Sequence, residues 1–324
     1  MGMLEELRKL TTGVFRGGVS SERDISLLSG ENVLQALRRR DYRVVDVDLT
    51  TTDAEEIMAI IRDKAIDIVF IALHGKFGED GGIQKILEDN RVTFTGAGSK
   101  AAFVSMDKTE TRRILLRNNV PMSEHWIEDE GLPEFKKPDY PLVVKPHAAG
   151  SSMGVSLVKY KSRLPKAIEE ARTYGQRVIV ERYIRGRELT VGILGSTPLP
   201  VVEMVFKRDF FDFSSKYEDE LTEFIVPASI PASLAQSVQE LSFKVFCLLG
   251  CRHLGRVDLR VDEELRPYVL ELNSIPGLTA HSLLPLAAKS RGISFEDLCE
   301  NVLVQALSDS KRNLIYEEST QKKD

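Results

Sequence analysis

Residues 255–282 read GRVDLRVDEELRPYVLELNSIPGLTAHS, and this stretch predicts a β-hairpin. Two apolar runs, Arg256–Val261 and Pro267–Leu272, flank a polar turn at 262–266, a pattern that is typical of two paired strands. If the turn is roughly symmetrical, Asp258 lies opposite Glu271. The hairpin then carries paired acidic side chains.

Alternation along the two strands sorts their side chains between two faces. One face is expected to carry a guanidinium, two carboxylates and an amide: Arg256, Asp258, Glu271 and Asn273. The other face is expected to join the core: Val257, Leu259, Val261, Leu270 and Leu272. Hard oxygen ligands suit Mg²⁺, which usually takes one or two carboxylates and completes its shell with nucleotide phosphates. A solvated face with a cross-strand charge pair is the alternative, and the hairpin alone favours neither.

Composition sets limits on the class of protein. A chain of 324 residues is long enough for two or three domains with sizeable cores. A net charge of −5 without a basic stripe argues against a nucleic-acid binder, and no apolar run approaches the ~20 residues of a membrane span. The charged start MGMLEELRKL is unlike a signal peptide. Three cysteines without a ligand motif, Cys247, Cys251 and Cys299, are interpreted as buried free thiols of a cytoplasmic protein.

The first part of the chain, about 12–107, alternates strands and helices and predicts a small parallel α/β sheet. Ligands in such sheets bind at the C-terminal ends of the strands, where Glu22 and His74 are expected to lie. His74 could equally anchor its loop, and Glu22 could complement a helix dipole. Strands are expected at Thr12–Phe15, Val44–Leu49, Ile66–Leu73 and just before Gly96, and helices at Asp53–Lys64, Ile83–Asp89 and around Ile25, Leu28, Val33, Leu34 and Leu37.

The second part, 108–188, predicts an α+β module with a loop of small residues at 146–154. Such a loop lets backbone N–H groups approach phosphate oxygens, and Lys145 at its entry offers a positive charge. A plain hairpin connection is the alternative. The expected elements are the helices Thr109–Asn118 and Leu164–Tyr174 and the strands Pro141–Lys145, Val155–Val158 and Val178–Ile184.

The third part, 189–324, contains the hairpin and a segment at about 207–220 that is rich in aromatic and charged residues. A loop of this length with three Phe and one Tyr is interpreted as a lid. The tail from Ser308 is expected to fray. The other expected elements are the strands Leu189–Leu194 and Leu199–Val205 and the helices Ala232–Leu249, Leu283–Lys289 and Ser294–Leu307.

Eight sequence blocks, spread from Thr12 to about Leu307, resemble the D-alanine–D-alanine ligase family of the ATP-grasp enzymes. They are GGVSSERDISLLSG (17–30), ALHGKFGEDG (72–81), SMDK (105–108), VVKPHAAGSSMGVSLV (143–158), VERYIRGRELTVGILG (180–195), SSKY (214–217), GRVDLRVD (255–262) and LELNSIPGLTAHSLLP (270–285). The resemblance implies a three-domain ATP-grasp fold with a Rossmann-like N-terminal domain. It also implies ligation of two D-alanine molecules through a D-alanyl phosphate, for peptidoglycan precursor synthesis.

The resemblance implies that ATP lies between the second and third domains. Lys108 and Lys145 would contact its phosphates, Glu181 the adenine amino group and Glu188 the ribose, while Lys216 would reach the γ-phosphate when the lid closes. Five more residues are implied to bind the nucleotide: Ser151, Ser152, Met153, Tyr183 and Ile184. Two Mg²⁺ or Mn²⁺ ions would be held by Asp258, Glu271 and Asn273, on the face that strand alternation predicts.

For the amino acids, the resemblance implies that Glu22 binds the ammonium of the first D-alanine in a set with Ser151 and Tyr217. Arg256 and the N–H of Gly277 would form the oxyanion hole. Three residues would line the substrate site, with Ser282 binding the second carboxylate: His74, Ser282 and Leu283. A homodimer is also implied.

Two departures from the family pattern concern three positions: Ala148-Ala149 stand where Arg-Glu is common, and Ile275 replaces a small polar residue. We expect altered affinity from these changes, since the proposed metal ligands and phosphate lysines are intact. Tyr217 suits D-alanine as the second substrate. Two alternatives remain: a related ligase that takes D-lactate or D-serine, and a nucleotide-binding protein that has lost catalysis.

Overall fold

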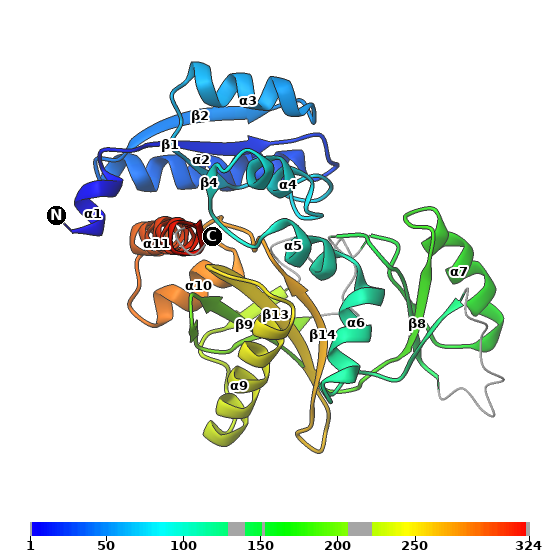
Figure 1. Ribbon diagram of the computed structural model, residues 1–324. Coiled ribbons are helices and arrows are strands. Elements are labelled where there is room, and N and C mark those ends of the chain that lie inside the picture. Colours follow the sequence, from blue (N-terminus) through cyan, green and yellow to red (C-terminus); the bar gives the residue numbers. More distant parts are fainter. Residues whose placement is uncertain (1, 129–139, 151–152, 207–221, 322–324) are drawn as a thin grey trace.

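Three β-sheets organise the chain (Figure 1). The structure is a computed structural model that describes residues 2–128, 140–150, 153–206 and 222–321, with only the backbone described for 313–321. The mixture of one parallel sheet and two antiparallel sheets agrees with the fold class predicted from the sequence.

The first sheet is parallel, in the order β2-β1-β3-β4, with helices on both faces (Figure 1). Neighbouring strand residues point to opposite faces, so Val14 packs with helix α2 while Phe15 packs with helix α3. The elements are α1 (Met3–Leu7), β1 (Thr11–Gly17), α2 (Arg23–Arg39), β2 (Arg43–Leu49), α3 (Ala54–Asp63), β3 (Ile68–Ile71), α4 (Gly82–Asp89), β4 (Thr93–Phe94) and α5 (Ser99–Met106).

The second sheet is antiparallel, in the order β5-β8-β6-β7, and the apolar face of α7 covers it. Helix α6 begins at Lys108, where the side chain of Asp107 accepts hydrogen bonds from the first turn. The elements are α6 (Lys108–Arg117), β5 (His125–Ile127), β6 (Leu142–Pro146), β7 (Ser156–Val158), the 3₁₀ helix η2 (Lys161–Arg163), α7 (Leu164–Arg172) and β8 (Val178–Arg182). Strand β5 and helix α5 are absent from the expectations above.

The third sheet follows the order β12-β11-β9-β13-β14, with β10 paired to β9. Helix α9 packs on its apolar face. The elements are β9 (Arg187–Leu194), β10 (Thr197–Pro198), β11 (Val202–Phe206), β12 (Thr222–Ile225), α9 (Ala232–Leu248), β13 (Leu254–Val261), β14 (Pro267–Asn273), α10 (Leu283–Ser290) and α11 (Phe295–Gln321). The domain boundaries at 107 and 188 stay a prediction.

The hairpin β13–β14 has the predicted pairing at its functional end, with Asp258 opposite Glu271 and Arg256 opposite Asn273. Nearer the turn, Leu259 pairs with Val269, so one residue of β14 is extra at a β-bulge. The bulge makes one prediction wrong, since Leu270 lines a cavity and Val269 occupies the core instead. The other four predicted core residues of the hairpin are buried: Val257, Leu259, Val261 and Leu272.

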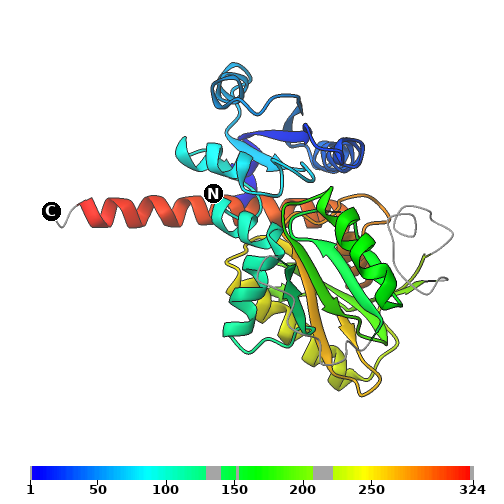
Figure 2. The same cartoon turned by 90° about the vertical axis from the view of Figure 1, so that its right-hand side faces the viewer.

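Two further expectations, the burial of Cys247 and the fraying of the tail, are wrong. Cys247 is exposed, whereas Cys251 and Cys299 are buried free thiols; burial raises the pKa of Cys251 to about 11 and raises that of Cys299 as well. Leu28 lies on α2, as expected, and is exposed at the cavity. Helix α11 continues past Ser308 to Gln321, and Figure 2 shows its end projecting beyond the rest of the fold.

The N-terminal sheet and the C-terminal helices share one hydrophobic core. Residues of α2, such as Leu34, pack in the same cluster as residues of α10 and α11, such as Leu284 and Leu303. An exposed ion pair between Arg39 and Glu296 lies at the rim of this interface. In the described part of the chain, no helix is long and apolar enough to cross a membrane.

Candidate active site

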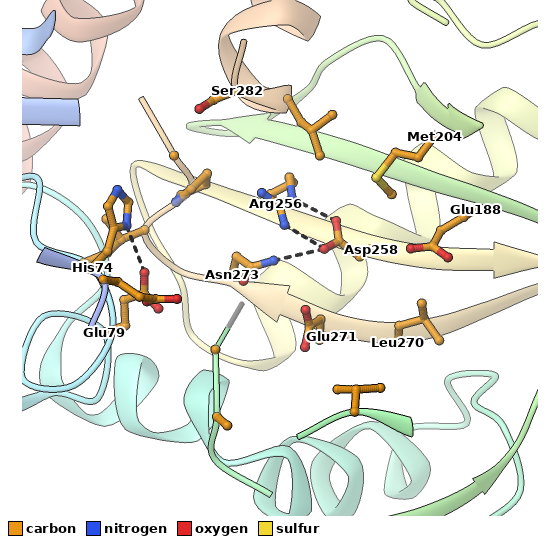
Figure 3. A pocket seen from close by; sticks show the side chains of 18 of the residues that line it. His74, Glu79, Glu188, Met204, Arg256, Asp258, Leu270, Glu271, Asn273 and Ser282 are labelled. Atoms are coloured by element: carbon orange, nitrogen blue, oxygen red, sulfur yellow. Dashed lines mark hydrogen bonds and ion pairs between the residues drawn. The ribbon is translucent and has the colours of Figure 1, made fainter. Parts of the chain in front are cut away.

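A cavity of about 520 Å³ receives residues from all three sheets. Figure 3 shows the hairpin residues Arg256, Asp258, Glu271 and Asn273, with His74 and Glu79 to their left. The predicted site residues that line it are Glu22, His74, Lys108, Lys145, Glu181, Tyr183, Glu188, Arg256, Asp258, Glu271, Asn273, Gly277, Ser282 and Leu283.

The hairpin carboxylates lie on one face, as predicted from strand alternation (Figure 3). Asp258 accepts two hydrogen bonds of 2.8 Å from the forked guanidinium of Arg256, one of 3.1 Å from Asn273 and one of 2.5 Å from Thr190. Burial disfavours the charge of Arg256, but Asp258 outweighs this and raises the pKa of the guanidinium. The carboxylate of Glu271 lies 3.3 Å from Nζ of Lys108.

A buried charge network lies on the second sheet. Nζ of Lys145, on β6, is 2.8 Å from Oε1 of Glu181, on β8, and Arg112 of α6 makes an ion pair with the other carboxylate oxygen. Burial lowers the pKa of Lys145 despite the attraction of Glu181. Burial works against the charge of Glu181, but Arg112 and then Lys145 hold its pKa below the ordinary value. Glu181 therefore stays ionised beside two cations.

Sequence reasoning missed Arg260, which follows Asp258 on the same face of β13. Its Nη1 donates to Glu188 over 2.8 Å, and its Nη2 donates to the carbonyl oxygen of Gly186 over 2.9 Å. The guanidinium carbon stands 4.7 Å from the ring centroid of Tyr183. Strand alternation from Asp258 could have placed Arg260 in the cavity, but its three contacts are long-range and leave no local signal.

The N-terminal sheet contributes Glu22 and His74 from segments that follow β1 and β3. A Cβ on Gly75 would lie 2.8 Å from the Glu22 carboxylate, and a Cβ on Gly150 would lie 3.1 Å from it. Glycine at both positions therefore allows close approach of the backbone to this carboxylate. Nδ1 of His74 is 3.0 Å from Oε1 of Glu79 (Figure 3).

Residues 276–282 form the loop between β14 and α10 at the cavity. Ser282 is the N-cap residue of α10, and its Oγ accepts a 3.0 Å hydrogen bond from the N–H of Thr279. Among the described residues, the N–H of Gly277 makes no hydrogen bond. A Cβ on Gly277 would meet Oγ of Ser282 at 2.7 Å, so the loop packs tightly there. An unpaired N–H in the cavity that Arg256 also lines suits an oxyanion.

Some predicted site residues are not described by the structure or do not line the cavity. The described part of the chain leaves out the predicted lid segment at 207–220 and four predicted site residues: Ser151, Ser152, Lys216 and Tyr217. Met153 and Ile184 are described but do not line the cavity. Of the departures, Ala149 offers its carbonyl oxygen to Nζ of Lys108 over 3.0 Å, and Ile275 is buried in the core beneath β3.

Comparison with known proteins shows to which family the chain belongs. Family models described as D-ala D-ala ligase N-terminus and D-ala D-ala ligase C-terminus match residues 52–97 and 117–304. A D-alanine–D-alanine ligase of Syntrophotalea carbinolica is 39% identical over 303 residues, which are 93% of this chain and 98% of the relative. The chain belongs to the D-alanine–D-alanine ligase family. A family member of Carboxydothermus hydrogenoformans is 40% identical over 91% of this chain and 97% of its own.

Solved structures in this ligase family have the same fold. The D-alanine–D-alanine ligase of Bacillus anthracis complexed with ATP is 30% identical, with a TM-score of 0.81, and the match covers 94% of this chain and 99% of that one. The VanG D-Ala:D-Ser ligase of Enterococcus faecalis is 27% identical, with a TM-score of 0.79 and coverage of 92% and 99%. Family membership thus agrees with the resemblance inferred from the sequence blocks.

Proposed function

We propose that this protein is an ATP-dependent D-alanine–D-alanine ligase that makes D-alanyl-D-alanine for peptidoglycan precursor synthesis. One observation carries the proposal beyond family membership. A single cavity is lined by Lys108 of α6 and Lys145 of β6, by the acidic face of the hairpin, and by Glu22 and His74 from the segments that follow β1 and β3. A reaction that joins two amino acids at the expense of ATP needs these three kinds of group together.

The nucleotide end of the cavity is assigned to Lys108, Lys145, Glu181 and Glu188. Both lysines would contact ATP phosphates, where positive charge offsets the charge that moves during phosphoryl transfer. Glu181 and Glu188 are acceptors suited to the adenine amino group and the ribose hydroxyls. Their pairing with Arg112 and Arg260 keeps both carboxylates in place before the nucleotide binds.

Asp258, Glu271 and Asn273 would hold two Mg²⁺ or Mn²⁺ ions. Within the described residues no cluster of three or more His, Cys, Asp or Glu side chains suits a metal. Two carboxylates and one amide on one face nevertheless fit Mg²⁺, which completes its shell with phosphates. When bound, the ions neutralise phosphate charge. The hairpin residues keep their oxygens on one face for this purpose.

The amino-acid end of the cavity supports two steps, a phosphoryl transfer and then an acyl transfer. A carboxylate oxygen of the first D-alanine attacks the γ-phosphorus of ATP, and ADP leaves. The amine of the second D-alanine then attacks the acyl carbon; the new C–N bond forms, the C–O bond to phosphate breaks, and the amine loses a proton. Arg256 and the N–H of Gly277 would stabilise the tetrahedral oxyanion between these events.

Substrate orientation is assigned to charged groups at the two ends of this region. Glu22 would bind the ammonium of the first D-alanine, with Ser151 and Tyr217 as predicted partners. Ser282, Leu283 and the N-terminus of α10 would receive the carboxylate of the second, since helix N-termini attract anions. His74, which lines the same cavity, would be a further substrate contact. A homodimer and a lid at 207–220, whose Lys216 would reach the γ-phosphate on closure, complete the proposal.

The deciding experiment measures phosphate release and dipeptide formation from ATP, Mg²⁺ and D-alanine. D-alanyl-D-alanine should be formed with one phosphate released per dipeptide, and L-alanine should give neither product. ATP binding without dipeptide would overturn the assignment and favour a nucleotide-binding protein instead.

A related ligase is the second candidate, because a D-Ala:D-Ser ligase has a similar fold. The same assay with D-serine or D-lactate in competition with D-alanine separates the two. A single product, D-alanyl-D-alanine, supports the main proposal, and a mixed dipeptide or depsipeptide as the major product supports the alternative.

A further inference from the structure

Helix α2 of the N-terminal sheet contacts the loop that carries Gly277. We infer that Ser29 and Asn32 are positioning residues that hold the backbone of Leu278, so that the N–H of the neighbouring Gly277 faces the reacting carbonyl. This inference rests on the proposed function, because it assigns a role to the oxyanion donor. Neither residue touches the substrate in this scheme.

Both polar groups of the Leu278 backbone are held by α2. The N–H of Leu278 donates to Oγ of Ser29 over 3.4 Å, and its carbonyl oxygen accepts from Nδ2 of Asn32 over 3.2 Å. Ser29 and Asn32 are one helical turn apart and therefore share one face of the helix. Two contacts on one residue fix both its position and its rotation.

The two hydrogen bonds to the Leu278 backbone also restrain Gly277, which precedes it in the chain. The side chain of Leu278 is buried in the core that joins α2 to α10, so it cannot shift without loss of packing. Gly277 lines the cavity and its N–H is unpaired among the described residues. A glycine peptide is flexible by itself, so an oxyanion donor at this position needs an external restraint.

Ser29 also connects this restraint to His74. Oγ of Ser29 is 3.0 Å from Nε2 of His74, and Nδ1 of His74 is 3.0 Å from the Glu79 carboxylate. The carboxylate only accepts, so Nδ1 carries a proton and, in the neutral ring, Nε2 accepts from the Ser29 hydroxyl. The hydroxyl of Ser29 thus contacts both the His74 loop and the Gly277 loop and fixes their relative positions.

The chain offers a matched control for Ser29. Ser26 is one turn earlier on α2, is equally buried, and donates its Oγ hydrogen to the carbonyl oxygen of Ala72 over 2.8 Å, within the first sheet. Ser29→Ala and Ser26→Ala each remove one buried hydroxyl from the same helix. Only Ser29→Ala releases the Gly277–Leu278 peptide.

The test is rapid-quench single-turnover kinetics with ATP, Mg²⁺ and D-alanine, with ADP and dipeptide measured in each sample. For Ser29→Ala we expect dipeptide formation about tenfold slower, a fraction of the 10²–10³ expected for complete loss of an oxyanion donor. First-turnover ADP formation and the KM for ATP should stay within twofold. Ser26→Ala should leave both rates within twofold.

Asn32 supplies a second, independent pair of variants. Asn32→Asp replaces the donor to Leu278 with a repelling oxygen. Gln35→Glu makes the same change of charge on the exposed side of α2, where Gln35 donates a hydrogen bond to Glu31. We expect dipeptide formation to slow about tenfold in Asn32→Asp and to stay within twofold in Gln35→Glu. This pair decides the question if Ser29→Ala does not fold.

The outcomes separate the inference from the proposed function. A wild-type protein that makes no dipeptide would contradict the function itself. Wild-type activity together with Ser29→Ala and Asn32→Asp rates equal to their controls would overturn only the positioning role. Equal slowing of ADP and dipeptide formation would overturn it too, because that pattern indicates general damage to the site.

Discussion

Arg256 joins the acidic face of the hairpin to the proposed oxyanion site. Asp258 accepts from its Nε and Nη2, so the guanidinium is held in one orientation while Nη1 remains available to an oxyanion. Arg256→Ala should lower kcat for dipeptide formation by about 10²–10³, which is the usual effect of removing an oxyanion donor. ATP affinity, measured by calorimetry, should change little. A kcat within threefold of wild type would exclude this role.

Arg260 is expected to affect nucleotide binding, since it holds Glu188 and stacks on Tyr183. Arg260→Leu should raise the KM for ATP about tenfold, because loss of a charge-assisted hydrogen bond costs about 1.5–3 kcal/mol, and should leave kcat within threefold. Arg266→Leu is the control, since Arg266 pairs with Asp262 in the exposed turn of the same hairpin. Equal KM values in the two variants would contradict the assignment.

At the level of single residues, the sequence predicts what depends on local alternation. The shared face of Asp258 and Glu271 follows from the strand period of two and is confirmed. The contacts of Ser29 could not be predicted, because its partner Leu278 is 249 residues away and ordinary serines on helices look the same. Arg112 was also missed, since a fully buried arginine on an amphipathic helix has no sequence signal.

The hairpin as an element is altered by its bulge, which moves Leu270 into the cavity and leaves Leu272 in the core. Leu270→Ala should raise the KM for ATP several-fold and change stability little, because the side chain covers the cavity rather than packing inside. Leu272→Ala should lower the free energy of unfolding by about 2–5 kcal/mol and leave the KM unchanged. Urea unfolding and initial-rate kinetics measure both quantities.

The reverse pattern, a stability loss in Leu270→Ala and a KM change in Leu272→Ala, would show that the two strands pair without the bulge. A bulge shifts the alternation of core and cavity side chains by one residue, and since Val269 and Leu270 are both apolar, the sequence does not show which of them faces the core. The short strand β5 was missed for a related reason: its three residues, His125–Ile127, are too few to show a period.

At the scale of the whole molecule, His253 links separate parts of the fold. Its Nδ1 accepts from the N–H of Gly96 over 3.0 Å, and its Nε2 is 3.0 Å from Asp309 on α11. Burial, and then Arg252, lower the pKa of His253 from 6.5 to about 4, against the pull of Asp309. The folded protein therefore keeps this ring neutral at pH values where the unfolded chain protonates it.

The sign of the pH effect follows from this difference. The contribution of neutral His253 to the free energy of unfolding is present above pH 6.5 and is lost as the pH falls toward 4. The expected loss is about 1 kcal/mol between pH 7 and 5.5. His253→Asn should lack this part of the dependence of the unfolding free energy on pH. Asparagine is chosen because it tolerates the positive φ of 65° at this position. Urea unfolding at several pH values measures the slope. The control is His281→Asn, an exposed site, and an identical slope in both variants would contradict the prediction.

The exposed turn at 262–266 has a practical consequence. Its backbone is closed on itself, since Asp262 accepts from the N–H groups of Glu264 and Arg266, and the bulge separates it from the acidic face. The turn is the free tip between β13 and β14 in Figure 1. A dye or surface linker attached at Glu264 would leave the cavity open, so single immobilised molecules could be observed while they consume substrate.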